Sequence, residues 1–241
     1  MNFLSAAATF YKEGGIFMNA VLVIAVLIVA MVVERMIVIG RATGINGGKL
    51  TDDLVRRVTG GDLAGARDIS SQSDVPLARV AQAMLEVGAA DEETLQSAAD
   101  DAGTLALPQL TRRLPHLGVL ANSATLIGLL GTITGLITAI SGVGVADAAQ
   151  RSAYLSAGIS EALHTTAFGL MIAIPTLLIQ GWLNGRVEAI AQDIDQLSIR
   201  LSKALAHAGH GGGLAPHVVA RPVPAALPVS LAEAAAHPGN R

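Results

Sequence analysis

The sequence predicts an all-α polytopic membrane protein with three transmembrane helices and one helical domain between the first two. Three observations support this fold class: 51% of the 241 residues are hydrophobic, only 15% are charged, and the mean hydropathy is +0.53. In soluble domains, about a quarter of the residues are charged. The net charge of −3 provides no basic surface, so nucleic acid is not expected as a partner. The chain has no cysteine, which excludes disulfides and cysteine-ligated metals.

The first transmembrane helix is expected over residues 15–40, after a short interfacial segment over residues 1–14. Residues 16–33 carry no charge, and about 20 apolar residues are enough to span a bilayer as a helix. Glu34 and Arg35 follow directly. We expect this pair to anchor the end of the span at the lipid headgroups.

Residues 41–113 have a different character from the first span. Charged and apolar residues alternate there, the apolar positions repeat at helical spacing, and Gly60 and Gly61 interrupt the pattern. This pattern predicts several helices that form a domain outside the membrane.

The remaining spans are expected over residues 114–145 and 154–183, joined by a loop over residues 146–153. The first of these spans contains no Asp, Glu, Lys or Arg. An amphipathic helix is expected over residues 184–207. The tail, residues 208–241, is rich in Gly, Pro and Ala and is expected to be disordered.

The basic residues beside the spans predict the orientation in the membrane, because cytoplasmic flanks collect Lys and Arg. The side with more of them carries Arg35, Arg41, Lys49, Arg112, Arg113 and Arg186. The opposite side carries Lys12 and Arg151. The N-terminus and the loop over residues 146–153 are therefore expected in the periplasm. The domain over residues 41–113 and the C-terminus are expected in the cytoplasm.

Small residues form a continuous face on each of the last two spans. At steps of three and four residues, the second span has Thr125, Gly128, Thr132, Gly135, Ala139 and Gly142, and the third has Gly158, Ala162, Thr165, Gly169, Ala173 and Thr176. These stripes have little bulk to present to lipid, so we expect them to face other subunits or a pore. Close helix packing alone, with hydroxyls bonded to the backbone, would produce the same pattern.

Glu161 lies near or inside the hydrocarbon edge of the third span. Ionisable groups inside a membrane usually face a cavity or a partner, which favours a role in an ion path. The alternative is a first-turn carboxylate that complements the helix dipole, with Ser160 as the cap. That alternative requires the helix to begin near residue 160 rather than near Arg151. His164 either relays a proton or lies at the level of the headgroups.

Several short motifs in the last two spans resemble the MotA/TolQ/ExbB proton-channel family. They are "GLLGTITG" in the second span, and "GISEAL", "TTAFGL" and "AIP" in the third, in the family's order and spacing. Three spans with the large domain between the first and second resemble the ExbB/TolQ branch. The resemblance is strong over about residues 110–190 and rests on topology alone before them.

The resemblance implies a homo-pentamer whose last two spans line a central pore. Two copies of an ExbD/TolR-like single-span partner, each with a membrane aspartate, would lie in that pore, and a TonB/TolA-like force-transmitting protein is a further candidate partner. Thr132, Glu161 and Thr166 match the family's pore residues, and Thr165 joins them because it shares the Glu161 face. The doubled threonine and His164 depart from the simplest family pattern. Extra hydroxyls could coordinate sodium, so the proton is favoured as the translocated ion and sodium is the alternative.

The implied function is that of a stator subunit in a motor of the bacterial inner membrane. Such a motor would convert proton-motive force into mechanical work for an envelope process such as transport, envelope integrity or gliding, without a cofactor. The alternative is a membrane scaffold whose polar residues only join helices. No GxSxG elbow, HExxH motif or P-loop is present, so an enzyme is not expected.

Overall fold

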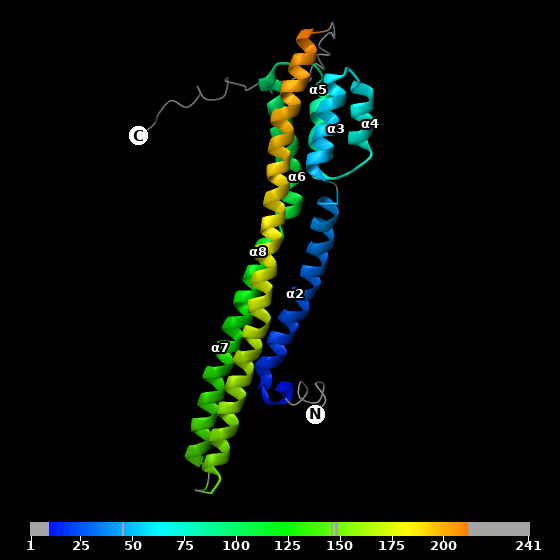
Figure 1. Cartoon of the computed structure of the whole chain (residues 1–241). Coiled ribbons are helices and arrows are strands. Elements are labelled where there is room, and N and C mark those ends of the chain that lie inside the picture. The colour runs from blue at the N-terminus through cyan, green and yellow to red at the C-terminus, as the bar shows by residue number, and fades with distance from the viewer. Residues whose placement is uncertain (1–9, 45, 146, 148, 212–241) are drawn as a thin grey trace, which may run out of the picture.

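The computed structural model is helical throughout most of the residues that it describes, which are 10–44, 46–145, 147 and 149–211. In chain order the helices are α2 (Gly15–Ala42), α3 (Gly47–Thr59), α4 (Leu63–Ser71), α5 (Pro76–Val87), α6 (Glu92–Thr111), α7 (Leu114–Val145) and α8 (Arg151–Gly211). Figure 1 shows an elongated molecule in which α7 and α8 run side by side and α3–α5 gather at one end. Most of the segment predicted over residues 1–14 and nearly all of the tail predicted over residues 208–241 lie outside the described residues, which leave out 1–9 and 212–241.

Within the residues that the structure describes, three helical stretches are long and apolar enough to cross a membrane, as predicted. They begin with α2, with α6 (which continues into α7) and with α8. Many of their large apolar side chains point away from the protein, among them Val26, Leu129, Ile133, Ile137, Met171 and Leu178. This outward display is expected for helices surrounded by lipid, because lipid tails are as apolar as the side chains themselves.

One helix, α8, continues without a break over 61 residues. The sequence predicted a transmembrane helix over residues 154–183 and a separate amphipathic helix after it. Asn184 and Gly185 do not interrupt α8, because Leu183 and Val187 on either side of them are both buried in the hydrophobic core. The membrane section and the section outside it therefore form one continuous rod.

The short helices have local start and stop signals. The side chain of Asn46 accepts a hydrogen bond from the Lys49 N–H (3.2 Å), and that of Asp62 accepts one from the Gly65 N–H (2.9 Å), which caps α3 and α4. Pro76 stands in the first turn of α5, where its missing N–H costs nothing. Gly88, with a φ of 76°, ends that helix.

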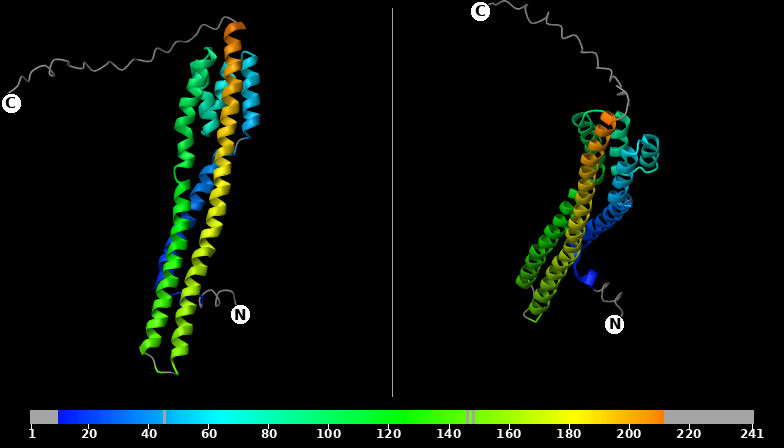
Figure 2. Two further views of the ribbon diagram at one scale, coloured as in Figure 1. Left: turned by 90° about the vertical axis from the view of Figure 1, so that its left-hand side faces the viewer. Right: turned by 45° about the horizontal axis from the view of Figure 1, so that its top comes forward.

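The core of the bundle lies between α3, α5, α6 and the C-terminal half of α8. Figure 2 shows that this half of α8 runs along the group of short helices. The fully buried side chains there include Leu54, Val58, Met84, Leu95, Leu197 and Leu201. The predicted amphipathic helix is thus part of the core of the domain predicted over residues 41–113.

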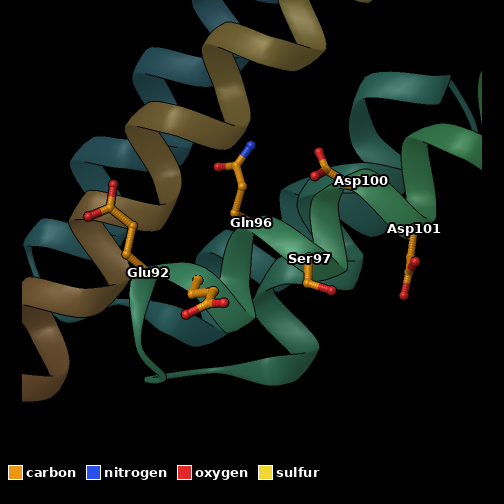
Figure 3. A pocket seen from close by; sticks show the side chains of 6 residues that line it. Glu92, Gln96, Ser97, Asp100 and Asp101 are labelled. Carbon is orange, nitrogen blue, oxygen red and sulfur yellow. The ribbon is translucent and has the colours of Figure 1, made fainter.

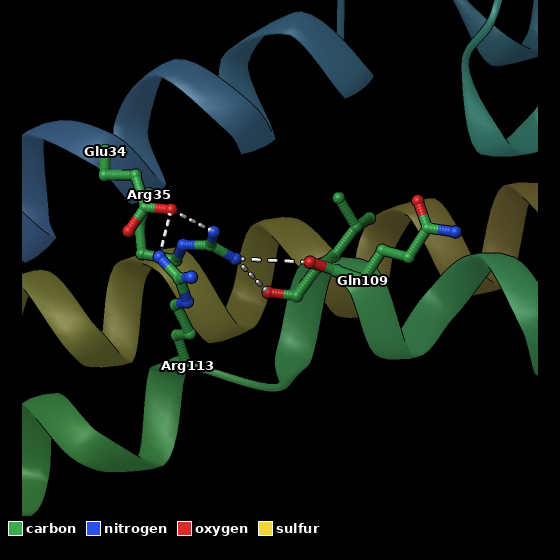
Figure 4. Close-up of polar contacts among 5 residues, drawn as sticks. Glu34, Arg35, Gln109 and Arg113 are labelled. Atoms are coloured by element: carbon green, nitrogen blue, oxygen red, sulfur yellow. Dashed lines mark hydrogen bonds and ion pairs between the residues drawn. The ribbon is translucent and has the colours of Figure 1, made fainter.

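Arg35 lies inside the protein, not at the lipid headgroups as the sequence suggested. Its residue is 5% exposed, and its Nη1 donates to the carbonyl oxygens of Gln109 (3.2 Å) and Leu110 (3.5 Å) at the end of α6 (Figure 4). Its Nη2 pairs with Glu34 (2.8 Å), which also pairs with Arg113. The backbone turns between α6 and α7, leaving carbonyl groups that a helix would otherwise satisfy. Arg35 supplies donors to them.

Candidate functional site

The small-residue stripes of α7 and α8 face each other within one chain. All six predicted members of the α8 stripe are buried. Gly135 packs so closely on α8 that a Cβ there would lie 2.9 Å from the carbonyl oxygen of Gly158. The expectation that both stripes face other subunits or a pore is therefore wrong, because each forms the partner surface of the other.

The α7 stripe differs from the prediction at two positions, because Ala124 and Gly131 are buried where Thr125 and Thr132 were expected. Gly131, not Thr132, points at α8, where a Cβ would lie 2.5 Å from the Cγ2 of Thr165. Thr132 is partly exposed, and its hydroxyl donates to the carbonyl oxygen of Leu129 (2.6 Å) in its own helix. Thr132 therefore does not join α7 to α8.

Thr166 crosses the interface between the two helices. Its hydroxyl donates to the carbonyl oxygen of Gly128 in α7 (2.8 Å). A Cβ on Gly128 would lie only 3.3 Å from the Cα of Thr166, so the absence of a side chain at Gly128 permits this close approach. This hydrogen bond fixes the position of α8 along the axis of α7.

Thr165 and Glu161 face the start of α2. Thr165 is fully buried, and its hydroxyl lies 2.7 Å from the carbonyl oxygen of Gly14 and 2.8 Å from that of Glu161. The carboxylate of Glu161 lies over Gly15, where a Cβ would be 1.8 Å from its Oε1. Gly15 also has a φ of 65°, a conformation that favours glycine.

The position of Glu161 in its helix decides one of the alternatives. Because α8 begins at Arg151, Glu161 lies nearly three turns inside the helix. The interpretation of Glu161 as a first-turn carboxylate with Ser160 as the cap is therefore wrong. Among the described residues, no group forms a hydrogen bond or ion pair with its side chain.

His164 contacts the N-terminal turn, which comprises residues 10–14. Its Nδ1 lies 2.7 Å from the carbonyl oxygen of Ser160, and its Nε2 lies 3.4 Å from the Oε2 of Glu13. The ring of Phe10 packs edge-on against the imidazole, with 4.7 Å between centroids. Phe168, one turn further along α8, contacts the same Phe10 ring.

The five candidate residues thus form separate groups. Glu161, His164 and Thr165 lie against residues 10–15, Thr166 faces α7, and Thr132 is bonded within its own helix. Their assignment to an ion path stays a prediction. The glycine pair before the first span was a sequence signal for the contact with Glu161, since adjacent glycines often mark a close approach of the backbone.

The other polar surface of note is an acidic one on α6. A shallow hollow there is lined by Glu92, Glu93, Gln96, Ser97, Asp100 and Asp101 (Figure 3). These side chains are mostly exposed, and the described part of the chain contains no group of three or more His, Asp or Glu side chains placed to hold a metal ion. The hollow is a solvated face of the bundle.

Comparison with known proteins connects these spans to a family. The sequence model of the MotA/TolQ/ExbB proton channel family matches residues 72–196, just over half of the chain. The chain belongs to the MotA/TolQ/ExbB proton channel family. The matched range includes all of α5, α6 and α7, and α8 through Gln196, so the hairpin and its polar residues are inside it.

Relatives place the chain in the ExbB/TolQ branch of that family. It is 23% identical to a putative biopolymer transport protein ExbB homolog of Methanothermobacter thermautotrophicus, over 83% of this chain and 69% of that protein. It is 38% identical to the Tol-Pal system protein TolQ of Haemophilus influenzae, over 36% of this chain and 38% of TolQ. A biopolymer transport protein ExbB of Neisseria gonorrhoeae is 35% identical, over 38% of this chain and 43% of that protein. The chain thus spans less than half of the length of the last two relatives.

Proposed function

We propose that this chain is the ExbB/TolQ-like stator subunit of an ion-driven motor in the bacterial inner membrane. Five copies would surround an ExbD/TolR-like single-span partner that carries a membrane aspartate. The complex would convert proton-motive force into mechanical work for an envelope process, with the force passed to a TonB/TolA-like protein. The N-terminus would be periplasmic, and the bundle of α3–α6 would be cytoplasmic.

The observation that carries this proposal is the environment of Glu161. Its side chain is half-buried in an apolar helix and has no hydrogen-bond partner among the described residues. A carboxylate in that position is costly unless it faces water, an ion or a partner. The proton is the favoured ion, because a carboxylate binds and releases protons without a coordination shell. Sodium is the alternative.

A membrane scaffold is the second candidate, and the threonines favour it. The hydroxyl hydrogens of Thr132, Thr165 and Thr166 are all directed at backbone carbonyl oxygens. Each hydroxyl therefore already has a structural role in joining or filling the helices. The stator and the scaffold make different predictions for Glu161, because its side chain forms no hydrogen bond among the described residues that a scaffold would need.

The deciding experiment measures ion flux in vesicles that contain the chain and its single-span partner. Glu161→Gln keeps the size of the side chain and removes its titration. A stator should still assemble, as a pull-down would show, while flux after a pH jump falls at least tenfold. A scaffold should keep both assembly and flux. Flux that follows sodium and ignores pH would keep the family role and change the ion.

The threonines supply a matched series in the same assay. Thr132→Val and Thr166→Val each remove a hydroxyl and preserve the side-chain shape. Thr176→Val is the control, because Thr176 lies on α8 like Thr166 and, like Thr132, its hydroxyl is bonded within its own helix, at Ile172 (2.6 Å). The stator proposal expects larger losses of flux at Thr132 and Thr166 than at Thr176. Equal losses at all three positions would favour packing.

Cysteine labelling tests the proposed orientation without interference from native thiols, since the chain has no cysteine. Ser71 and Ala149 are both exposed. Ser71 is the last residue of α4, and Ala149 lies between α7 and α8, which are joined at the end of the molecule opposite to α4 (Figure 1). In intact cells, a cysteine at position 149 should react with a membrane-impermeant reagent, and one at position 71 should not. The reverse pattern would overturn the orientation.

A further inference from the structure

The N-terminal turn covers the polar side of α8. Gly14 accepts the hydrogen bond from Thr165, Phe10 packs on the ring of His164, and Glu13 approaches its Nε2. Thr165 is fully buried beneath this turn, although the turn precedes it by about 150 positions in the chain. Whatever holds the turn in place therefore controls access to this side of α8.

A single protonation state would satisfy both contacts of His164. A carbonyl oxygen only accepts hydrogen bonds, so the Nδ1 that lies 2.7 Å from the Ser160 oxygen carries a hydrogen. A carboxylate oxygen also only accepts, so the Nε2 that lies 3.4 Å from Glu13 must carry one too if the contact is attractive. Both ring nitrogens carry hydrogens only in the charged imidazolium. In the neutral form with hydrogen on Nδ1, the lone pair of Nε2 would face a carboxylate.

Few ionisable groups lie near the contact between His164 and Glu13, so the charge on His164 determines its strength. Glu13 faces it from the turn, and Glu161 lies one helical turn earlier on α8. Residues 15–33 of α2 contain no ionisable side chain, and the α7 helix contains only His116, at its opposite end. Lys12 is exposed beside Glu13 on the turn. A histidine ordinarily changes its charge between about pH 5 and pH 8.

We propose that His164 and Glu13 form a proton-controlled contact that holds the N-terminal turn over Glu161 and Thr165. When the imidazole is charged, the ion pair and the Gly14–Thr165 hydrogen bond keep the turn in place. When the imidazole is neutral, the ion pair is lost and the turn is held more weakly. If Glu161 belongs to an ion path, the contact also makes access to that path depend on the pH of its own side of the membrane. Only this last consequence rests on the proposed function.

A spin label on the turn tests the contact directly. Lys12→Cys gives a single thiol on an exposed position of the turn, in a full-length chain with no other cysteine. In nanodiscs, the ratio of immobilised to mobile label should fall about two- to fivefold between pH 5.5 and pH 8, the size expected for a partly exposed ion pair. Glu13 and His164 have 49% and 26% of their side-chain surface exposed, which keeps the expected change modest.

Three further variants decide the origin of the change. His164→Gln and Glu13→Gln should each remove most of the pH dependence, whereas His116→Gln at the far end of α7 should leave it intact. Glu13 is exposed, so its substitution does not threaten the fold. A label whose mobility is the same at both pH values would overturn the proposal. So would a pH dependence that persists in both His164→Gln and Glu13→Gln.

Ion flux separates this proposal from the proposed function. If both are correct, Glu13→Gln should shift the pH profile of flux while the maximum flux survives. If the native complex carries no flux but the label still responds to pH through His164, the stator proposal fails and the contact stands. If flux is present and the label does not respond, the contact fails and the stator proposal stands.

Discussion

The hairpin of α7 and α8 and the bundle of α3–α6 are packed in opposite ways. In the hairpin, Gly, Ala and Thr lie inside and Leu, Ile and Met lie outside. In the bundle, Leu, Val and Met lie inside, and charged pairs such as Arg200 with Asp52 (2.7 Å) lie on the surface. The single helix α8 passes through both regions, so the backbone does not cause the difference.

The surrounding solvent explains this inversion. Water drives large apolar side chains together, and the bundle gains stability in proportion to the apolar area that it buries. Lipid tails provide no such drive, so membrane helices gain from close backbone approach and from hydrogen bonds across the contact. The two halves of α8 therefore need different residues on their buried sides, and the following substitutions should separate them.

The largest difference is expected for leucine-to-alanine substitutions. Leu201→Ala removes a side chain that is fully buried in the bundle and should cost about 2–5 kcal/mol of the free energy of unfolding. Leu129→Ala in the hairpin removes one that is 52% exposed and should cost less than about 0.5 kcal/mol. Chemical denaturation in detergent micelles measures both. Similar costs at the two sites would show that the hairpin also depends on large side chains.

A glycine-to-alanine pair on α8 tests the hairpin. A Cβ at Gly158 would lie 2.5 Å from the Cβ of Ala139 and 2.8 Å from the carbonyl oxygen of Gly135, so Gly158→Ala should cost about 1–3 kcal/mol. Gly181 has no atom within 4 Å of a Cβ, so Gly181→Ala should stabilise the helix by up to about 1 kcal/mol. The two variants should differ in the sign of their effect on thermal unfolding. A stabilising Gly158→Ala would contradict the close packing.

The sequence predicted where the two helices of the hairpin lie, but it did not predict every residue of α7 that faces α8. Charge-free runs located the spans, and the spacing of small residues identified every member of the α8 stripe. On α7 the spacing fits two paths between Gly128 and Gly135, one through Gly131 and one through Thr132. Periodicity cannot choose between steps of three and four at this point. The partner Thr165 decides, since only a glycine fits against it.

Contacts between distant segments could not be predicted from periodicity. The hydrogen bond between Thr165 and Gly14 and the approach of Glu13 to His164 join segments about 150 residues apart. Arg35 was expected at the headgroups because charges near a span end usually lie there. Its actual place depends on the free carbonyl groups where α6 ends, and no local pattern in α2 reports them.

Arg35 joins α2 to the end of α6, just before the hairpin begins, and its substitution should have an intermediate effect. Arg35→Met keeps an apolar stem of similar length but leaves the carbonyl groups of Gln109 and Leu110 without their donor. We expect a cost of about 1–2 kcal/mol in the free energy of unfolding. Arg112→Met is the control, because Arg112 is exposed at the same turn. If both variants lose the same stability, a general loss of positive charge would explain the effect.

The smallest expected effect is a pH dependence of two helix caps in the bundle. The Thr94 hydroxyl and the Thr94 N–H hold the pKa of Asp91 below its ordinary value, and the Gly65 N–H and Arg57 do the same for the pKa of Asp62. A carboxyl whose pKa is lower in the folded state stabilises the fold above its ordinary value of 3.8, and this contribution is lost as the pH falls through the lower folded value. The Gly, Ala and Thr contacts of the hairpin do not titrate.

Acidification from about pH 5 to about pH 3 should therefore loosen the bundle before the hairpin. Hydrogen exchange, corrected for its intrinsic pH dependence, measures both regions in one sample. Asp91→Asn should make the loss of protection at the start of α6 shallower, because asparagine caps a helix about as well as aspartate and does not titrate. Asp195→Asn, at an exposed position of α8, is the matched control and should change nothing. If the loss of protection at the start of α6 is the same in Asp91→Asn as in the unmodified protein, groups other than Asp91 cause it. If the hairpin loses protection at a higher pH than the bundle, the contrast between the two regions is wrong.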